Sequence, residues 1–404
     1  MIKRIKDLFL IPSYGLLTLC MLCIGIGVSI TMPYLSLYFT EERGISTGAV
    51  GIFIAVSSLS GVLVNSLIAK RSDTGWDRKW IIMIALTSSV VGYASYLVFQ
   101  NFYVLLIMVT IFNGLGAAAL PQVFAYAQES ASKSSKDKTF AISTLRSLVS
   151  LGFIVGPMGG AFLLQAAGYE GVFGSTALIY LAIAVLILVF MQKRTKPAMD
   201  KKVKTKEAGI PHLQNRKIWL PYMAFIFLFA VHAINNIITP LFIVNDLNGT
   251  YTDVGIVVML SAGLEIPIML AFGLLGSKMS NHQIMLFGCI VVLLYFVILS
   301  MASESWHIIA AQLLQAVFVA IIMGNGLSYF SDLLPNSPGV SATLYANSST
   351  IGKLIGNLSG GLMADILGNR NVYLASLICV FMAIFIFWNQ SRSIKANVSA
   401  DLPS

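Results

Sequence analysis

The sequence predicts an all-α membrane protein with twelve transmembrane helices in two pseudo-symmetric six-helix bundles. Hydrophobic residues make up 57% of the 404 residues and charged residues only 11%, whereas a typical soluble domain has about 25% charged residues. The mean hydropathy is +0.83. In addition, apolar stretches recur along the chain at the length of about twenty residues that a bilayer requires. The composition is therefore typical of an integral membrane protein rather than of a soluble one.

The apolar stretches divide into two groups of six. They lie at 14–39, 47–69, 80–100, 103–128, 139–165 and 172–192, and then at 218–244, 252–276, 283–301, 307–331, 339–367 and 372–390. Between the groups, the polar stretch 193–217 carries nine basic residues together with Pro197 and Pro211. We therefore expect an N-terminal bundle over 1–192, a cytoplasmic basic linker over 193–217 and a C-terminal bundle over 218–404.

The distribution of lysine and arginine predicts the orientation, because cytoplasmic loops near helix ends carry their excess. With the N-terminus inside, all but four of the 26 basic residues fall on cytoplasmic segments. The exceptions are Arg43 and Arg370 outside, and Arg146 and Lys353 within helices. We expect both termini to be cytoplasmic. Nucleic-acid binding could also explain the net charge of +9, but the basic residues are spread over many short loops, so we expect none.

The two halves repeat small residues and prolines at an offset near 200. The pairs are Pro33 with Pro240, Gly51 with Gly255, Gly152 with Gly352, Gly156 with Gly356, and Gly160 with Gly360. Many secondary transporters are built from such repeats, with the site near the midplane of the membrane. Glycines that merely let membrane helices pack closely are the alternative explanation.

A glycine-rich motif, GFIVGPMGG, occupies 152–160 in the fifth apolar stretch. Glycine lets another helix approach, and proline frees a backbone carbonyl and bends the helix. The motif resembles the antiporter motif of major facilitator exporters, which makes Gly156 and Pro157 candidates for gating. A generic helix kink is the alternative.

The short loop AKRSDTGWDRK at 69–79 carries two acids and four bases. An acid at a helix end can pair with bases and backbone amides there and form a cytoplasmic latch. The loop is similar to the signature between the second and third helices of the major facilitator superfamily. We therefore predict gating roles for Asp73 and Arg78. The equivalent loop in the second half, 276–282, has no acid.

A resemblance to a narrower family rests on four segments: AKRSD at 69–73, ALPQVFA at 119–125, GLEIP at 263–267, and DLLP at 332–335 followed by ATL at 342–344. Together they resemble the bacterial sugar efflux transporter family over nearly the whole chain. The resemblance implies a major facilitator fold in the bacterial cytoplasmic membrane and proton-driven export of sugars or glycosides. Lys353 is not expected from that family.

Glu265 is the predicted proton-coupling residue. It lies in the middle of the apolar stretch 252–276. An ionisable carboxyl at bilayer depth costs on the order of 2 to 3 kcal/mol even on a lenient insertion scale. This cost indicates a functional role, and a carboxyl can bind and release a proton. A structural ion pair with Lys353 is the alternative.

Two cations within helices are predicted to contact the substrate. Arg146 lies about eight residues into its helix, and its guanidinium should face water, substrate or an acid; snorkelling to the membrane surface is the alternative. Lys353 lies deeper in its helix.

Sugars offer many hydrogen-bonding groups but no charge, so their sites require amides, hydroxyls and aromatic faces. The further predicted substrate-binding residues are Tyr34, Asn113, His232, Asn235, Asn236, Gln315 and Asn347. Each of these could instead make an interhelical hydrogen bond. His232 could also be a second proton carrier or a packed neutral histidine.

The sequence therefore predicts a monomeric transporter that moves its substrate by alternating access, with protons and the lipid bilayer as its other partners. The alternative is a multidrug/proton antiporter for lipophilic compounds. No enzyme motif such as His-Glu-x-x-His and no nucleotide-binding glycine loop is present in the sequence, and we expect no cofactor or metal.

Overall fold

The computed structural model describes residues 13–72, 77–134, 138–191, 215–275, 279–335 and 337–400. All elements in these ranges are helical. Contacts divide the chain into two compact units. Unit 1 comprises Met1–Arg43 and Val56–Lys201, and unit 2 comprises Gly44–Ala55 and Lys202–Ser404.

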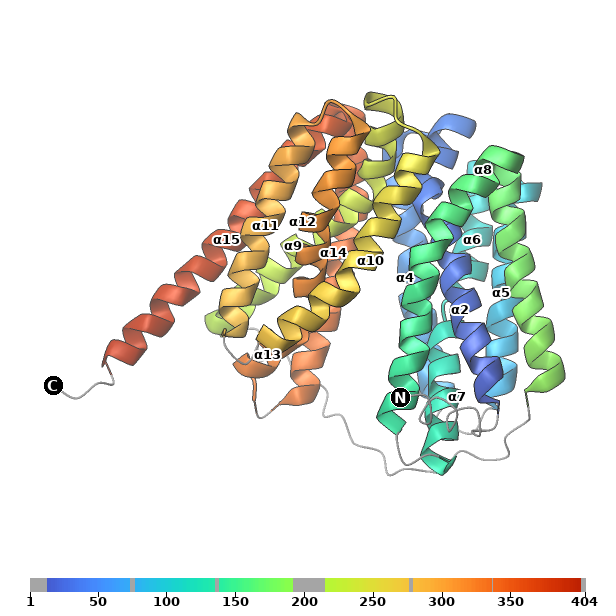
Figure 1. Cartoon of the computed structure of the whole chain (residues 1–404), viewed down its shortest axis with the longest axis horizontal. Helices are drawn as coiled ribbons and strands as arrows, with labels where there is room; N and C mark the ends of the chain where they lie inside the picture. The colour runs from blue at the N-terminus through green and yellow to red at the C-terminus, as the bar shows by residue number, and fades with distance from the viewer. Residues whose placement is uncertain are drawn as a thin grey trace. The chain divides into compact units, whose positions relative to one another are not determined.

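Each unit is a bundle of long helices (Figure 1). The helices of the first half are α2 (Tyr14–Thr31), η1 (Met32–Tyr34), α3 (Leu35–Leu37), η2 (Tyr38–Glu42), α4 (Thr47–Ser72), α5 (Arg78–Val98), α6 (Phe102–Gly116), α7 (Ala119–Ser134) and α8 (Lys138–Phe190). Those of the second half are α9 (Arg216–Leu241), η4 (Phe242–Asp246), α10 (Tyr251–Leu275), α11 (Asn281–Met301), α12 (Ser305–Gly324), α13 (Gly326–Leu333), α14 (Pro338–Leu367) and α15 (Asn369–Ala400).

Ten segments of the described chain are long and apolar enough to cross a membrane. One of them, Thr144–Phe190, has 47 residues, which is twice the length that a bilayer needs. It reverses direction at Ala167 and Gly168, whose backbones are not helical (Figure 1). The predicted stretches 139–165 and 172–192 are the two arms of this hairpin. The predicted stretch 339–367 forms the 30-residue helix α14, which is too polar to count among the ten.

Side chains at the N-cap positions stabilise the first turns of several helices. Asp77, Asn101 and Asn215 accept hydrogen bonds from backbone N–H groups in the first turns of α5, α6 and α9. Ser280 and Gln283 form a capping box at the start of α11. These contacts satisfy N–H groups that have no partner within the helix.

Glycines form a closely packed seam between α2 and α8 in unit 1. A Cβ on Gly152 would lie 2.6 Å from the backbone nitrogen of Ile26, and one on Gly156 would collide with Ser29 Oγ. Ser29 Oγ donates a hydrogen bond to the Gly152 carbonyl oxygen at 2.9 Å. The motif at 152–160 therefore works as a helix-packing surface, as small residues do in membranes.

Unit 2 repeats this seam between α9 and α14. A Cβ on Gly352 would lie 2.6 Å from the Ile226 carbonyl oxygen, and one on Gly356 would collide with the backbone of Ala230. The sequence pairs Gly152 with Gly352 and Gly156 with Gly356 thus occupy equivalent positions in the two units.

Irregular backbone is repeated as well. The π-helical segments η2 and η4 end corresponding helices of the two halves. Gly168 and Gly368, which are 200 residues apart, both have a left-handed backbone with φ of 62° and 78°. A residue with a side chain would be strained there. Two predicted continuous stretches are also interrupted, one between α6 and α7 and the other between α12 and α13.

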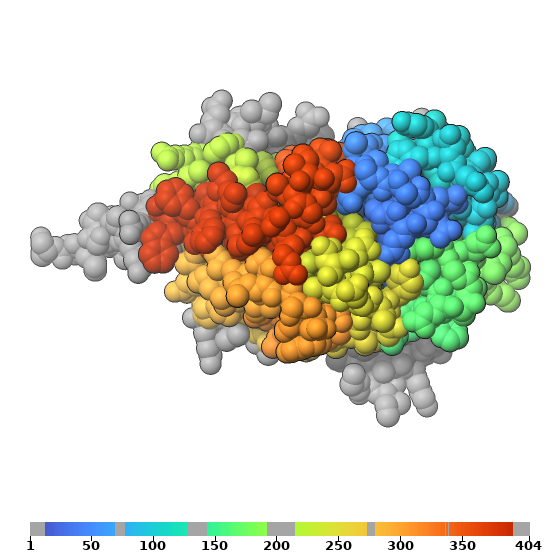
Figure 2. All heavy atoms as spheres, turned by 90° about the horizontal axis from the view of Figure 1, so that it is seen from above, coloured from blue at the N-terminus to red at the C-terminus, as the bar shows by residue number. Residues whose placement is uncertain are grey.

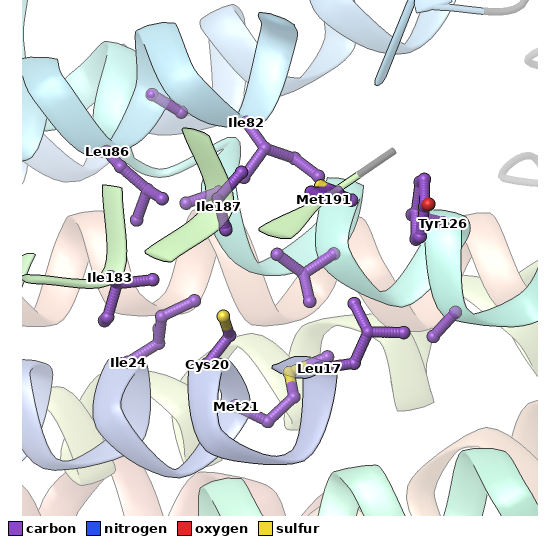
Figure 3. Close-up of a cluster of buried hydrophobic side chains, with 14 of the residues drawn as sticks. Leu17, Cys20, Met21, Ile24, Ile82, Leu86, Tyr126, Ile183, Ile187 and Met191 are labelled. Carbon is purple, nitrogen blue, oxygen red and sulfur yellow. The ribbon is translucent and has the colours of Figure 1, made fainter. Parts of the chain in front are cut away.

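An apolar core holds unit 1 together (Figure 3). It brings Leu17 and Cys20 of α2 together with Ile82 of α5, Tyr126 of α7 and Ile187 of α8. All of these side chains are at most 2% exposed. The core lies beside the packing seam and fixes the position of the helices around it.

In unit 2, η4 contacts α10 and α15. Figure 2 shows the yellow and red parts of the chain, to which these elements belong, side by side. Asn369 Nδ2 donates a hydrogen bond to Asp246 Oδ2 at 2.7 Å. This bond ties the end of η4 to the start of α15.

We predict that Gly152→Ala destabilises the protein by about 1–3 kcal/mol, because the added methyl group overpacks the seam against backbone atoms. Gly159→Ala is the matched control on the same helix, because a Cβ there meets nothing within 4 Å. The measurement is thermal unfolding of the purified full chain in detergent. Equal melting temperatures for the two variants would show that the seam is not closely packed.

Candidate functional site

Unit 1 contains a cavity of about 270 Å³ at the interruption between α6 and α7. Its wall carries the polar side chains Ser89, Tyr93, Asn113 and Tyr180. The Tyr93 and Tyr180 rings are stacked, with centroids 5.5 Å apart and planes inclined by 13°. The cavity therefore combines aromatic faces with an amide and a hydroxyl, as sites for small polar molecules do.

Two glycines make room for the polar groups of this cavity. A Cβ on Gly92 would collide with Asn113 Oδ1, and a Cβ on Gly116 would collide with Ser89 Oγ. Gly116 is also the last residue of α6. The interruption of the helix and the two glycines together place Ser89 and Asn113 at the cavity wall.

Five side-chain polar atoms in the described part of the chain are buried without a hydrogen-bond partner. They are Ser57 Oγ, Thr110 Oγ1, Asn113 Oδ1, His232 Nδ1 and Gln315 Oε1. Such atoms cost free energy in the folded protein, and each one calls for an explanation such as a ligand or an ordered water. Three of the five belong to residues that the sequence predicts for substrate binding.

The other predicted residues of unit 1 make packing contacts. Tyr34 is 1% exposed, and its hydroxyl donates to the Pro157 carbonyl oxygen at 2.7 Å. Pro157 and Gly156 lie in the α2–α8 seam. Arg146 is exposed, and its guanidinium carbon lies 5.7 Å from the centroid of the Phe124 ring.

The structure describes one of the two gating residues predicted in the loop at 69–79. Arg78 Nη1 donates to Gln122 Oε1 at 2.9 Å and thereby joins α5 to α7. Asp73 lies outside the described residues.

In unit 2, α9 presents two polar pairs with different surroundings. Asn235 Oδ1 accepts hydrogen bonds from Thr239 Oγ1 at 2.9 Å and from Tyr295 Oη at 3.1 Å. Thr239 Oγ1 also lies 3.1 Å from Tyr373 Oη. This pair therefore belongs to a network that joins α9 to α11 and α15.

The second pair, His232 and Asn236, lies on a different face of α9. Asn236 is exposed, and its Nδ2 lies 3.4 Å from His232 Nε2. His232 Nδ1 is the unpaired buried atom. His232 Nδ1 thus keeps an unused hydrogen-bonding position, whereas the oxygen of Asn235 is already satisfied.

The remaining predicted substrate residues come from α12 and α14. Gln315 of α12 is 3% exposed, and Asn347 of α14 is exposed. Lys353 of α14 is half-buried, with Nζ 6.0 Å from the centroid of the Phe229 ring of α9.

Glu265 lies in the middle of α10 and is half-buried, two residues before Pro267. Within the described residues, no hydrogen bond or ion pair involves its carboxylate. In particular, Glu265 and Lys353 do not form the ion pair that the sequence left open. A carboxylate without a fixed cation remains available to a proton.

Sequence reasoning did not include Ser89, Tyr93 and Tyr180. The chain has 15 tyrosines, and nothing in their local sequence separates the two cavity residues from the others. Gly92, next to Tyr93, would indicate a cavity residue only if its contact with Asn113 were already known.

Comparisons with known proteins agree with this architecture. A family model described as Major Facilitator Superfamily matches residues 17–347 and, in a second match, 222–402. Sugar efflux transporter A of Dickeya chrysanthemi is 29% identical over 364 residues, which are 90% of this chain and 91% of that protein. Sugar efflux transporter B of Salmonella typhimurium is 27% identical over 361 residues, which are 89% and 91% of the two chains.

A solved structure shares the fold. The nucleoside transporter NupG has a TM-score of 0.79 and 12% sequence identity, over 93% of this chain and 98% of that one. At this identity the likeness concerns the fold alone.

We predict opposite stability effects for two matched substitutions. Asn113→Leu replaces an unpaired amide oxygen and loses no hydrogen bond, so the melting temperature should stay the same or rise. Asn235→Leu leaves the hydroxyl groups of Thr239 and Tyr295 without their acceptor, and it should destabilise the protein by about 1–3 kcal/mol. Thermal unfolding in detergent measures both. A large loss of stability in Asn113→Leu would mean that Asn113 is a structural residue.

Proposed function

The chain belongs to the Major Facilitator Superfamily and is a multi-pass membrane transporter rather than an enzyme, and we propose that it exports sugars or glycosides in exchange for protons. The sugar efflux transporters to which it is similar cover about nine tenths of its length. We further propose that it lies in the bacterial cytoplasmic membrane with both termini in the cytoplasm.

The observation that carries the proposal is the set of unpaired buried atoms at Asn113, His232 and Gln315. Within each unit, a substrate hydroxyl group can donate a hydrogen bond to the amide oxygen of Asn113 or Gln315, or bond to His232 Nδ1, and each such bond removes the free-energy cost of an unpaired buried atom. Tyr93 and Tyr180 line the unit 1 cavity together with Asn113. Aromatic walls of this kind suit the C–H groups of a sugar ring.

Glu265 is the residue that we propose for proton coupling. Its carboxylate has no partner among the described residues, so its charge can be neutralised by a proton. A driving force on the order of 150 mV supplies about 3.5 kcal/mol per proton. That free energy sustains roughly a 300-fold concentration gradient, so one carboxyl is energetically sufficient for export.

The two-unit architecture suits transport by alternating access. In alternating access, two repeats rock against each other and expose the site to one side of the membrane at a time. The glycine seams lie inside the units, between α2 and α8 and between α9 and α14. Each unit can therefore move as a body while the packing within it is kept.

We predict that Glu265→Gln abolishes proton-driven accumulation of a labelled glycoside in everted membrane vesicles, because the amide cannot carry a proton. Binding of the glycoside should persist. Glu42→Gln makes the same chemical change at an exposed position at the end of η2 and should leave accumulation unchanged. Proton-driven accumulation in Glu265→Gln equal to that of the wild type would exclude the coupling role.

A second prediction separates sugar export from export of lipophilic cations, which Glu265 could also bind. Lys353, which lies in the same unit as Glu265, would repel such cations, so we expect an unlabelled glycoside to inhibit transport of a labelled glycoside much better than a lipophilic cation does. Competition in the same vesicles measures this. Stronger inhibition by the lipophilic cation would favour the multidrug function.

A further inference from the structure

Lys353 places a positive charge in the interior of unit 2. It follows Gly352, one of the residues at which α14 packs against α9. The seam holds the start of the lysine side chain next to α9, and its Nζ lies 6.0 Å from the centroid of the Phe229 ring. Aromatic contact of this kind stabilises an ammonium only modestly. The charge therefore needs a further partner.

The helices around Lys353 do not supply an acid. α14 packs mainly against α9, α13 and α15, and the sequences of α9 and α15 contain no Asp or Glu. α13 contributes Asp332, which accepts a hydrogen bond from Asn281 Nδ2 at 2.8 Å. α14 itself contributes Asp365, which accepts from the Gly48 backbone N–H at 2.9 Å. Asp365 is twelve residues from Lys353, or about 18 Å along the helix.

Glu265 of α10 does not neutralise the lysine either. Among the residues that the structure describes, no ion pair involves Lys353. Such an unpaired cation within a membrane-embedded bundle is costly and indicates a functional site.

The face of α9 that carries Phe229 also carries groups that can donate hydrogen bonds. Phe229, His232 and Asn236 are spaced by three and four residues and therefore share one face of α9. His232 lies about one turn of α9 beyond Phe229, and its Nδ1 is unpaired. The Asn236 amide is exposed on the same face. An ammonium, an imidazole and an amide N–H together match the acceptor oxygens of an anion.

We propose that Lys353, His232 and Asn236 form an anion subsite in unit 2, and that the exported sugar carries a carboxylate, as uronic-acid glycosides do. The inference rests on the proposed function and specifies the substrate class of that site. A single lysine balances a single negative charge, which favours a carboxylate over a doubly charged phosphate. The membrane potential, negative inside, also drives an anion outward.

The experiment compares two probes that differ only at one carbon, methyl glucoside and methyl glucuronide. Binding to the purified full chain and transport into proteoliposomes are measured for each. The wild type should bind the glucuronide roughly tenfold more tightly or better, the effect of one charge-assisted hydrogen bond. Lys353→Met should remove that preference, so that the two probes bind about equally well. Lys353→Arg should retain most of it.

Lys217→Met is the matched control. It removes the same charge from an exposed position in the first turn of α9, and it should behave as the wild type does. If Lys353→Met fails to fold, the wild-type comparison and Lys353→Arg still decide the question.

Three results would overturn the inference. Equal or tighter wild-type binding of the glucoside would exclude an anion subsite while leaving sugar export intact. An equal loss of both ligands in a folded Lys353→Met variant would make the lysine a structural residue. If the wild type neither binds nor transports either probe, the proposed function fails, and the subsite fails with it.

Discussion

A polar group inside a bilayer must find its hydrogen-bond partner within the protein, because lipid tails offer none. Most of the described chain meets this constraint through close packing. The glycines of α8 bring α2 so near that Ser29 can bond to the Gly152 carbonyl oxygen, and the Tyr34 hydroxyl satisfies the Pro157 carbonyl oxygen. Against this background, five buried side-chain atoms of the described residues have no hydrogen-bond partner, and three of them belong to residues that we propose for substrate binding.

The sequence predicted the helices well because hydrophobic length is set by the bilayer. The stretch 339–367 became α14 (Pro338–Leu367), and 283–301 became α11 (Asn281–Met301). The interruptions were not predicted. The stretch 103–128 breaks after Gly116, and 307–331 breaks at Asn325. Small and apolar residues surround the first break, whereas the second has the sequence Gly324-Asn325-Gly326. The mean hydropathy over about twenty residues stays high at both places, so hydropathy alone does not register the break.

Site residues could be predicted only in part, because the sequence shows which polar groups are costly but not which of them are already bonded. Asn113, His232 and Gln315 retain unpaired atoms, whereas the Asn235 oxygen is satisfied by Thr239 and Tyr295. Likewise, Glu265 and Lys353 form no ion pair because of the way α10 and α14 pack in unit 2. The number of residues between them in the sequence does not predict this.

Helix geometry explains how α9 carries both a structural hydrogen-bond network and the proposed substrate-binding residues. Successive residues of an α-helix point about 100° apart, and residues four apart point nearly the same way. Asn235 and Thr239 therefore lie together on the face that α11 and α15 cover, and His232 and Asn236 lie together on the next face. A shift of one residue thus separates the network that joins α9 to α11 and α15 from the pair that we propose for substrate binding. The same offset on α14 separates Gly352, which packs against α9, from Lys353, whose ammonium lies near Phe229 without an acidic partner among the described residues.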